Sequence, residues 1–193
     1  MCQLCAVNLN NSALNSIFLS TQLTIDAIGN QDGTGFITTE KGGKINLWKS
    51  KLAADDIENL GSIIKDHVIN SNPIIAHVRA ASTGIKVERE NAHPFVGKRF
   101  ALAHNGRLYD KNEVVRDNQK KDADDTGIAS DSLKFLSALE LVAKENKSMT
   151  IVELLNKAME EFKGKFAFLI YDSATEKHYA VRVIQQTSVL LRL

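Results

Sequence analysis

The sequence predicts a single domain of the α+β class over residues 1–193. Three observations favour this class. Short apolar runs typical of strands gather toward both ends of the chain, and segments with helical spacing lie between them. Their order does not follow the regular strand–helix alternation of a parallel sheet. With 193 residues, of which 44% are hydrophobic, the chain is also long enough to bury a sizeable core.

In the first half of the chain, glycine and proline separate the expected elements. Gly42 and Gly43 mark a turn between two strands, and Pro73 ends a helix before an apolar, β-branched run that is typical of a buried strand. The helix before Pro73 is amphipathic, with Leu60 and Ile64 at helical spacing. Strands are expected at 2–8, in two segments of 30–48 and at 74–78, and helices at 12–21 and 53–69.

In the second half, helical segments precede a series of strands. Gly164 is expected to break the chain between the last helix and the strand that follows it. The polar stretch 117–130 is expected to be a loop. Helices are expected at 131–145 and 150–162, and strands at 99–104, 165–172, 178–184 and 188–191.

Composition and charge exclude several classes of function. The 24 basic and 23 acidic side chains give a net charge of +1, so no overall field attracts nucleic acid or an anionic membrane. The first residues lack the pattern of a signal peptide, and the longest strongly apolar run, 166–171, is too short to cross a bilayer. Two cysteines three residues apart cannot form a disulfide framework, which favours a reducing compartment. We therefore expect a soluble, cytoplasmic protein that binds neither nucleic acid nor membranes.

The most informative residue is Cys2, directly behind the initiator methionine. Methionine is normally removed when the next residue is small, and the chain would then begin with a residue that carries both a thiol and a free α-amine. The thiolate is a nucleophile, and an α-amine with a pKa of about 8 can act as its base. Cys2 is therefore a candidate catalytic nucleophile.

Polar clusters downstream could serve such a nucleophile, and each also has an ordinary structural explanation. Arg79 ends an apolar strand, where its guanidinium needs either a bound anion or an internal salt bridge. The pair Asn105-Gly106 either forms a tight turn or supplies two N–H donors to an oxyanion. Asp131 opens a helix, where its carboxylate either caps the helix or faces a substrate ammonium group. His93, taken alone, belongs to a turn.

The order of these clusters along the chain is more specific than any one of them. Five motifs follow one another: a terminal Cys2, H-x-R at 77–79, N-A-H-P-F at 91–95, H-N-G at 104–106 and S-D at 130–131. Together they resemble the class II glutamine amidotransferase domain, whose members are N-terminal nucleophile (Ntn) hydrolases. The segment D-G-T-G-F at 32–36 also resembles the branch that contains small stand-alone members and the ergothioneine-pathway amidohydrolase. The likeness covers nearly the whole chain.

The resemblance implies a four-layer αββα sandwich of two antiparallel sheets and a hydrolytic reaction. Cys2 would attack the γ-carboxamide of glutamine to form a thioester and release ammonia, and water would then release glutamate. The resemblance assigns Asn105 and Gly106 to the oxyanion hole, Arg79 to the α-carboxylate and Asp131 to the α-ammonium group. It implies no metal and no cofactor.

The resemblance also makes the segment from Arg79 to about Glu90 a mobile loop that closes over the substrate, with Ser82 and Thr83 among the substrate-binding residues. Three histidines in the motifs are expected to orient loops rather than transfer protons: His77, His93 and His104. This chain departs from the family pattern at three positions. It has Ala80 where some members carry tryptophan, Ser82 where threonine is frequent, and Gln3 where many relatives carry glycine.

Alternative functions remain open at this level. A γ-glutamyl amide or peptide amidohydrolase would use the same nucleophile, and a non-catalytic binding module would retain Met1. A redox pair or a zinc site built on Cys2 and Cys5 is disfavoured, because the pair lies in a strand pattern and the histidine spacings match no compact zinc motif. The expected small-molecule partner is L-glutamine. The ammonia acceptor is expected on a separate synthetase subunit, and a homo-oligomer is compatible with the sequence.

Overall fold

The computed structural model describes residues 2–8, 11–68, 74–81, 86–110, 130–184 and 187–192. Strands of the first half form one antiparallel sheet, in the spatial order β1 (Gln3–Val7), β4 (Ile74–Val78), β2 (Thr34–Thr39) and β3 (Ile45–Ser50). Strand β4 has the sequence IIAHV and is buried along its whole length, as its apolar, β-branched composition predicts. Gly42 and Gly43 both have positive φ in the turn between β2 and β3.

Two helices cover this sheet, and both differ in length from the prediction. Helix α1 (Ser12–Asp26) continues past the predicted end at residue 21, because Leu23 is still buried against the sheet. The predicted single helix over 53–69 is wrong. A short 3₁₀ helix, η1 (Ala54–Asp56), comes first, and Asn59 then adopts a φ of 58° before α2 (Leu60–Val68) begins. Asparagine tolerates this left-handed conformation, which interrupts an α-helix.

Strands of the second half form the other antiparallel sheet, in the order β5 (Phe95–Val96), β6 (Phe100–Asp110), β7 (Phe162–Asp172), β8 (Lys177–Ile184) and β9 (Thr187–Arg192). Gly164 does not break the chain, contrary to the prediction, but lies inside β7 opposite Leu108. A Cβ atom at Gly164 would overlap the carbonyl oxygen of Arg107. Glycine therefore allows β6 and β7 to approach closely at this point.

The two helices on the second sheet begin with clear capping residues. Helix α3 (Asp131–Glu145) has the predicted bounds, and the side chain of Ser130 caps it by accepting from the backbone N–H of Leu133. Helix α4 (Ile151–Met159) starts with a capping box between Thr150 and Glu153 and ends before the predicted residue 162, which already belongs to β7. The predicted loop 117–130 lies outside the described residues, except for Ser130.

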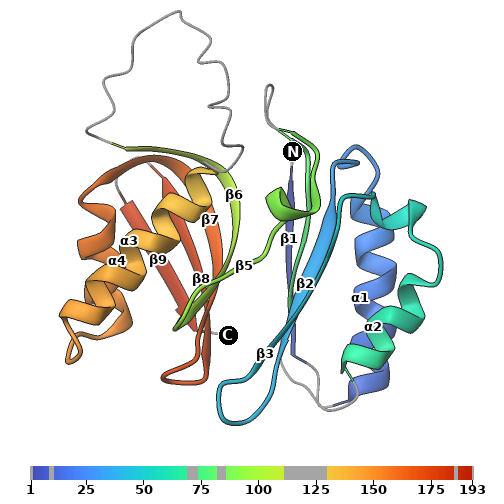
Figure 1. Cartoon of the computed structure of the whole chain (residues 1–193), viewed down its shortest axis with the longest axis horizontal. Coiled ribbons are helices and arrows are strands. Elements are labelled where there is room, and N and C mark those ends of the chain that lie inside the picture. Colours follow the sequence, from blue (N-terminus) through green and yellow to red (C-terminus); the bar gives the residue numbers. More distant parts are fainter. Residues whose placement is uncertain are drawn as a thin grey trace, which may run out of the picture.

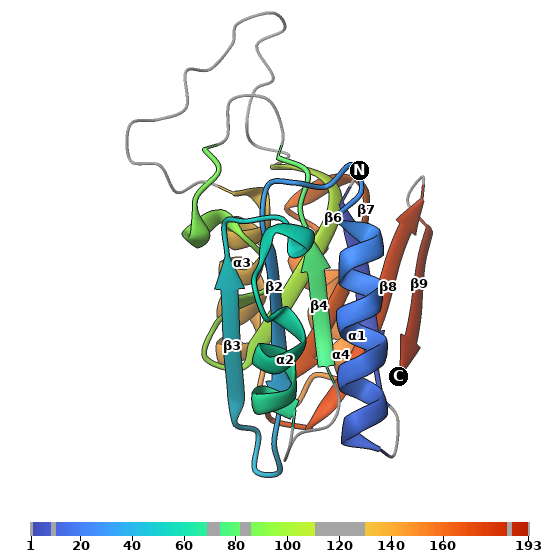
Figure 2. The same ribbon diagram turned by 90° about the vertical axis from the view of Figure 1, so that its right-hand side faces the viewer.

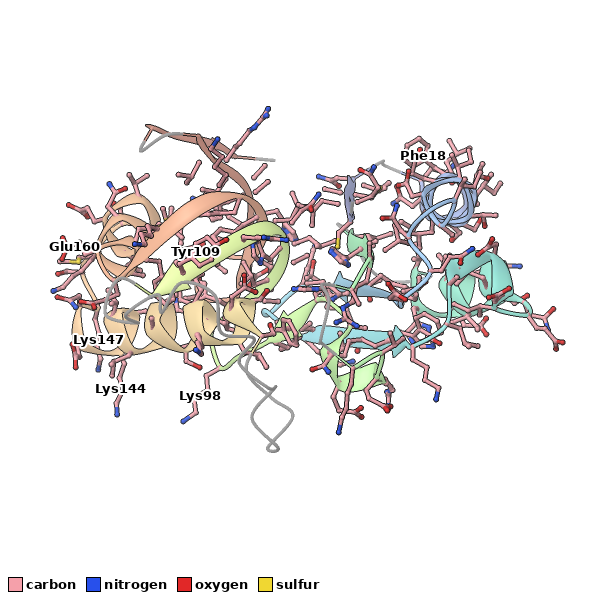
Figure 3. All side chains as sticks on the ribbon, turned by 90° about the horizontal axis from the view of Figure 1, so that it is seen from above. Phe18, Lys98, Tyr109, Lys144, Lys147 and Glu160 are labelled. Atoms are coloured by element: carbon pink, nitrogen blue, oxygen red, sulfur yellow. The ribbon has the colours of Figure 1, made fainter. Side chains whose placement is uncertain are left out.

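The sheets face each other, with α1 and α2 on one outer side and α3 and α4 on the other (Figures 1 and 2). Seen from above, Phe18 marks the α1 end of the molecule, and Lys144 and Lys147 mark the α3–α4 end (Figure 3). The core between the sheets consists of Ile37, Ile75, Ala101, Ala103, Leu169 and Tyr171. The predicted αββα sandwich of two antiparallel sheets is confirmed. No helix of the described residues is long and apolar enough to span a membrane.

Candidate active site

The first sheet places the predicted nucleophile against the end of β4. Cys2 precedes β1, and β1 pairs with β4 so that Gln3 lies opposite Val78. The half-buried Cys2 side chain therefore lies beside Ala80. The backbone N–H of Ala80 donates to the Cys2 sulfur over 3.2 Å, and the carbonyl oxygen of Ala80 accepts from the thiol over 3.3 Å. Two backbone contacts thus fix the position of the sulfur.

The second sheet brings the predicted oxyanion donors to the same place. Asn105 lies on β6, and its side-chain Nδ2 donates to the backbone carbonyl oxygen of Cys2. An amide nitrogen carries two N–H groups, and this contact uses one of them. The turn interpretation of Asn105-Gly106 is wrong, because β6 continues through both residues to Asp110. Gly106 has a φ of 125°, and a Cβ atom there would overlap the carbonyl oxygen of Lys165. This backbone conformation therefore requires glycine.

Arg79 directly follows β4 and is buried, with only 5% of its surface exposed. Its Nη1 donates to the carbonyl oxygens of Asp32 and Lys86, each over 3.4 Å. Burial lowers the pKa of the Arg79 guanidinium, and the nearby Asp32 and Cys2 oppose that shift. Within the described part of the chain, no carboxylate forms a salt bridge with Arg79. A buried guanidinium with only carbonyl partners is suited to bind an anionic ligand.

Asp131 is the first residue of α3, but Ser130 rather than Asp131 caps the helix. The Asp131 carboxylate accepts from the backbone N–H of Leu108 over 2.9 Å and from that of Ser132 over 2.8 Å. Burial alone would raise the pKa of Asp131, but His104 and these two N–H groups outweigh it and hold the pKa below its usual value. The side chain keeps 37% of its surface exposed. An ionised, oriented and accessible carboxylate can bind an ammonium group.

Three buried histidines lie next to these residues and contact one another through their rings. His77 Nε2 lies 3.1 Å from the carbonyl oxygen of His104, and both His93 and His104 contact the hydroxyl of Ser132. Burial lowers the pKa of His77 to about 3 and that of His93 well below its usual value. None of the hydrogen bonds described for these histidines reaches Cys2. Buried rings with contacts of this kind are suited to positioning their neighbours.

Asp32 is a site residue that the sequence reasoning did not select. Its carboxylate accepts from the backbone N–H of Ala81 over 2.7 Å, and its backbone N–H donates to the carbonyl oxygen of Arg79 over 2.9 Å. It therefore holds the start of the segment that follows β4. The D-G-T-G motif at 32–35 carries the signal for this role. The predicted substrate-binding residues Ser82 and Thr83 lie outside the described residues.

Cys5 lies in a different environment from Cys2. Cys5 packs against the core under α1 and α2, and burial raises the pKa of its thiol to about 11, which disfavours the reactive thiolate.

The described residues contain no group of three or more histidine, cysteine or acidic side chains arranged to hold a metal ion. A surface cavity of about 450 Å³ contains none of the predicted site residues and is lined by Glu40, Ile45, Asn46, Leu47, Asp66 and His67.

Comparison with known proteins identifies the family of the chain. The family model "Glutamine amidotransferases class-II" matches residues 1–188 of the chain. The chain belongs to this family. The chain is 32% identical over 117 residues to the glutamine–fructose-6-phosphate aminotransferase (isomerizing) of Streptococcus pyogenes serotype M3. The aligned segment covers 56% of this chain and 18% of that protein.

Two solved structures match nearly the whole chain. The allosteric regulatory enzyme of purine biosynthesis superposes with a TM-score of 0.63 at 20% identity, covering 94% of this chain and 37% of that chain. The glutamine phosphoribosylpyrophosphate amidotransferase of B. subtilis gives a TM-score of 0.54 at 16% identity, covering 98% of this chain and 41% of that chain. At these identities the likeness shows the fold alone. The class-II amidotransferase chain described here thus spans less than half the length of each of these relatives.

Proposed function

We propose that this chain hydrolyses the γ-amide of L-glutamine to glutamate and ammonia through a thioester on Cys2. The observation that carries the proposal is the meeting of Cys2 from the first sheet with the Asn105 amide from the second. This contact places a hydrogen-bond donor beside the nucleophile, where charge develops on the carbonyl oxygen during acyl transfer. Membership of the class-II amidotransferase family supports the same reaction.

The proposed reaction needs Cys2 at the N-terminus, because its α-amine then accepts the thiol proton. The thiolate attacks the amide carbon, and Asn105 Nδ2 with the Gly106 backbone N–H stabilises the oxyanion. The α-ammonium group returns the proton to the leaving nitrogen, so ammonia departs and the thioester remains. Water then attacks the thioester with the α-amine as base, and glutamate leaves while the Cys2 thiol is restored.

Two charged side chains are proposed to select the substrate. Arg79 binds the α-carboxylate, because its buried guanidinium has only carbonyl partners among the described residues. Asp131 binds the α-ammonium group, because its carboxylate is held by two backbone N–H groups and stays accessible. A charged group at each end of a small zwitterion fixes its orientation over the nucleophile. Ser82 and Thr83 are proposed to contact the substrate from the following segment.

The ammonia is proposed to pass to an acceptor enzyme that associates with this chain as a separate subunit. Residues 1–193 are proposed to act as one glutaminase domain in that assembly. The relative from S. pyogenes is named for the transfer of the glutamine nitrogen to fructose 6-phosphate, and the present chain matches 18% of its length. The family relationship therefore supports ammonia transfer without defining the acceptor.

The proposal is tested by glutamate release and by covalent labelling. We expect the protein that begins at Cys2 to release glutamate from L-glutamine, and we expect Cys2→Ala to abolish that activity. A glutamine-analogue electrophile should add to Cys2, as measured by mass spectrometry of the intact and digested protein. Cys5→Ala is the matched control and should keep the label, because Cys5 packs against the core. If the chain that begins at Cys2 takes no label and releases glutamate only from γ-glutamyl peptides, with the peptide amine as leaving group, the glutamine assignment is wrong.

A further inference from the structure

The hydroxyl of Ser132 lies at the centre of a buried polar cluster that joins three elements. It lies 2.9 Å from Nε2 of His93, in the segment before β5, and 2.8 Å from Nδ1 of His104 on β6. It also lies 3.3 Å from the Asp131 carboxylate at the start of α3. Ser132 is itself 1% exposed. Water therefore cannot replace any of these partners, and each contact must be satisfied within the cluster.

Proton counting determines the direction of each hydrogen bond. A serine hydroxyl donates one hydrogen bond and accepts two, whereas an ionised carboxylate only accepts. The Ser132 hydroxyl therefore donates to Asp131, and the two imidazoles donate to Ser132. His93 then carries its proton on Nε2, and His104 carries its proton on Nδ1. The same reasoning places the proton of His77 on Nε2, because its partner is the carbonyl oxygen of His104.

These directions agree with the rest of the cluster. The second ring nitrogens of His77, His93 and His104 are buried without a hydrogen-bond partner, so a proton on any of them would be an unsatisfied donor. Burial also lowers the pKa of His77 and of His93, which keeps both rings neutral. The cluster is therefore a chain of donors that begins at the two imidazoles of His93 and His104, passes through one hydroxyl and ends on the Asp131 carboxylate.

We propose that Ser132 is a positioning residue that fixes the Asp131 carboxylate for the α-ammonium group of the substrate, with His93 and His104 holding its hydroxyl in place. This inference rests on the proposed glutaminase function. Among the described residues, the Ser132 hydroxyl and His104 are the side chains that approach this carboxylate, whose other contacts are backbone N–H groups. Ser132 thereby affects selection of the α-amino group and leaves the reacting amide untouched.

Removal of the hydroxyl should move the carboxylate rather than unfold the domain. In Ser132→Ala the Nδ1–H group of His104 and the Nε2–H group of His93 lose their acceptor, and an Asp131 oxygen lies 3.6 Å from His104 Nδ1. The carboxylate is expected to turn toward His104 and away from the substrate. Ser132→Thr keeps a hydroxyl on the same carbon and serves as the conservative control.

The test compares L-glutamine with its des-amino analogue, 4-carbamoylbutanoate. For Ser132→Ala we expect KM for glutamine to rise about tenfold, the loss of one hydrogen bond to a charged group, with kcat changed less than about threefold. The kcat/KM for the analogue, which lacks the ammonium group, should change less than about twofold, and Ser132→Thr should stay within about threefold of wild type for both. Equal losses for both substrates would show a merely structural role, and no loss would show that the hydroxyl is dispensable.

A spectroscopic measurement tests the cluster independently of turnover. The chain has 5 histidines, so ¹⁵N-histidine NMR can assign the tautomer of each ring. We expect His104 as the Nδ1–H tautomer and His93 as the Nε2–H tautomer, and a His104 proton on Nε2 would overturn the proposal. If wild type binds no glutamine, the proposed function fails and this role fails with it. If wild type discriminates between the two ligands and Ser132→Ala discriminates equally, only the role of Ser132 fails.

Discussion

Replacing Gly106 by alanine should reduce both stability and activity, whereas the same replacement at Gly164 should reduce mainly stability. A Cβ atom at this residue would overlap the carbonyl oxygen of Lys165 and lie 2.7 Å from Cα of Phe166, at a φ of 125° that L-residues rarely adopt. Strain and overpacking together cost about 2–6 kcal/mol in the free energy of unfolding. Relief requires β6 to move by about 1 Å at the proposed oxyanion donor, and a displacement of that size costs about 10²-fold in rate.

The assay combines kcat/KM for glutamate release with urea unfolding for three variants. Gly164→Ala has the same kind of overlap, with the carbonyl oxygen of Arg107, and lies opposite Leu108, whose backbone N–H contacts Asp131 rather than the proposed oxyanion donors. It should lose stability as Gly106→Ala does and lose less activity. Gly61→Ala meets no atom within 4 Å and lies in helix α2, so it should be neutral or slightly stabilising. If Gly106→Ala keeps kcat/KM within about threefold of Gly164→Ala, then the backbone of Gly106 does not act on the substrate.

Three further predictions concern stability and the site. Below the ordinary histidine pKa of 6.5, the free energy of unfolding should fall, because burial holds the pKa of His77 near 3 and that of His178 near 4. The unfolded chain then binds protons that the folded chain does not, so the free energy of unfolding falls by up to about 1.4 kcal/mol for each ring with every pH unit below 6.5. His178→Phe should reduce this pH dependence, measured by urea unfolding at several pH values. Asp172→Ala should lower the unfolding free energy by about 3–5 kcal/mol in the same assay, because it leaves the partly buried Arg99 unpaired. Asp32→Ala should lower kcat/KM for glutamine by about tenfold and Asp32→Asn by less, because asparagine keeps an oxygen for the Ala81 N–H; equal losses would contradict this role.

Local sequence patterns predicted most helices and strands, and they failed where tertiary contacts determine the backbone conformation. The apolar run at 74–78 and the helix at 131–145 have their predicted bounds, since burial and capping are both visible in the sequence. Gly164 was expected to end an element, but its place inside β7 depends on the approach of β6, which no local pattern reports. The interruption at Asn59 likewise depends on a single left-handed residue within an otherwise helical pattern.

The site could be predicted as a set of residues but not as an arrangement. Motif order pointed to Cys2, Arg79, Asn105 and Asp131, and the structure brings Asn105 into contact with Cys2 across the two sheets. That contact depends on how closely the sheets pack. The layer between them includes the small residues Ala101 and Ala103, and His77 reaches the carbonyl oxygen of His104 from one sheet to the other.

Because the site is divided between two sheets, its geometry depends on the side chains packed between them. Cys2 is fixed by the first sheet through Ala80, whereas Asn105 belongs to β6 of the second. A larger side chain at Ala103, which is fully buried between the sheets, should therefore separate the proposed oxyanion donor Asn105 from the proposed nucleophile Cys2. The free energy of unfolding should change little, since cores tolerate some repacking. The rate of the proposed acyl transfer should fall strongly, because an oxyanion donor acts only over hydrogen-bond distance.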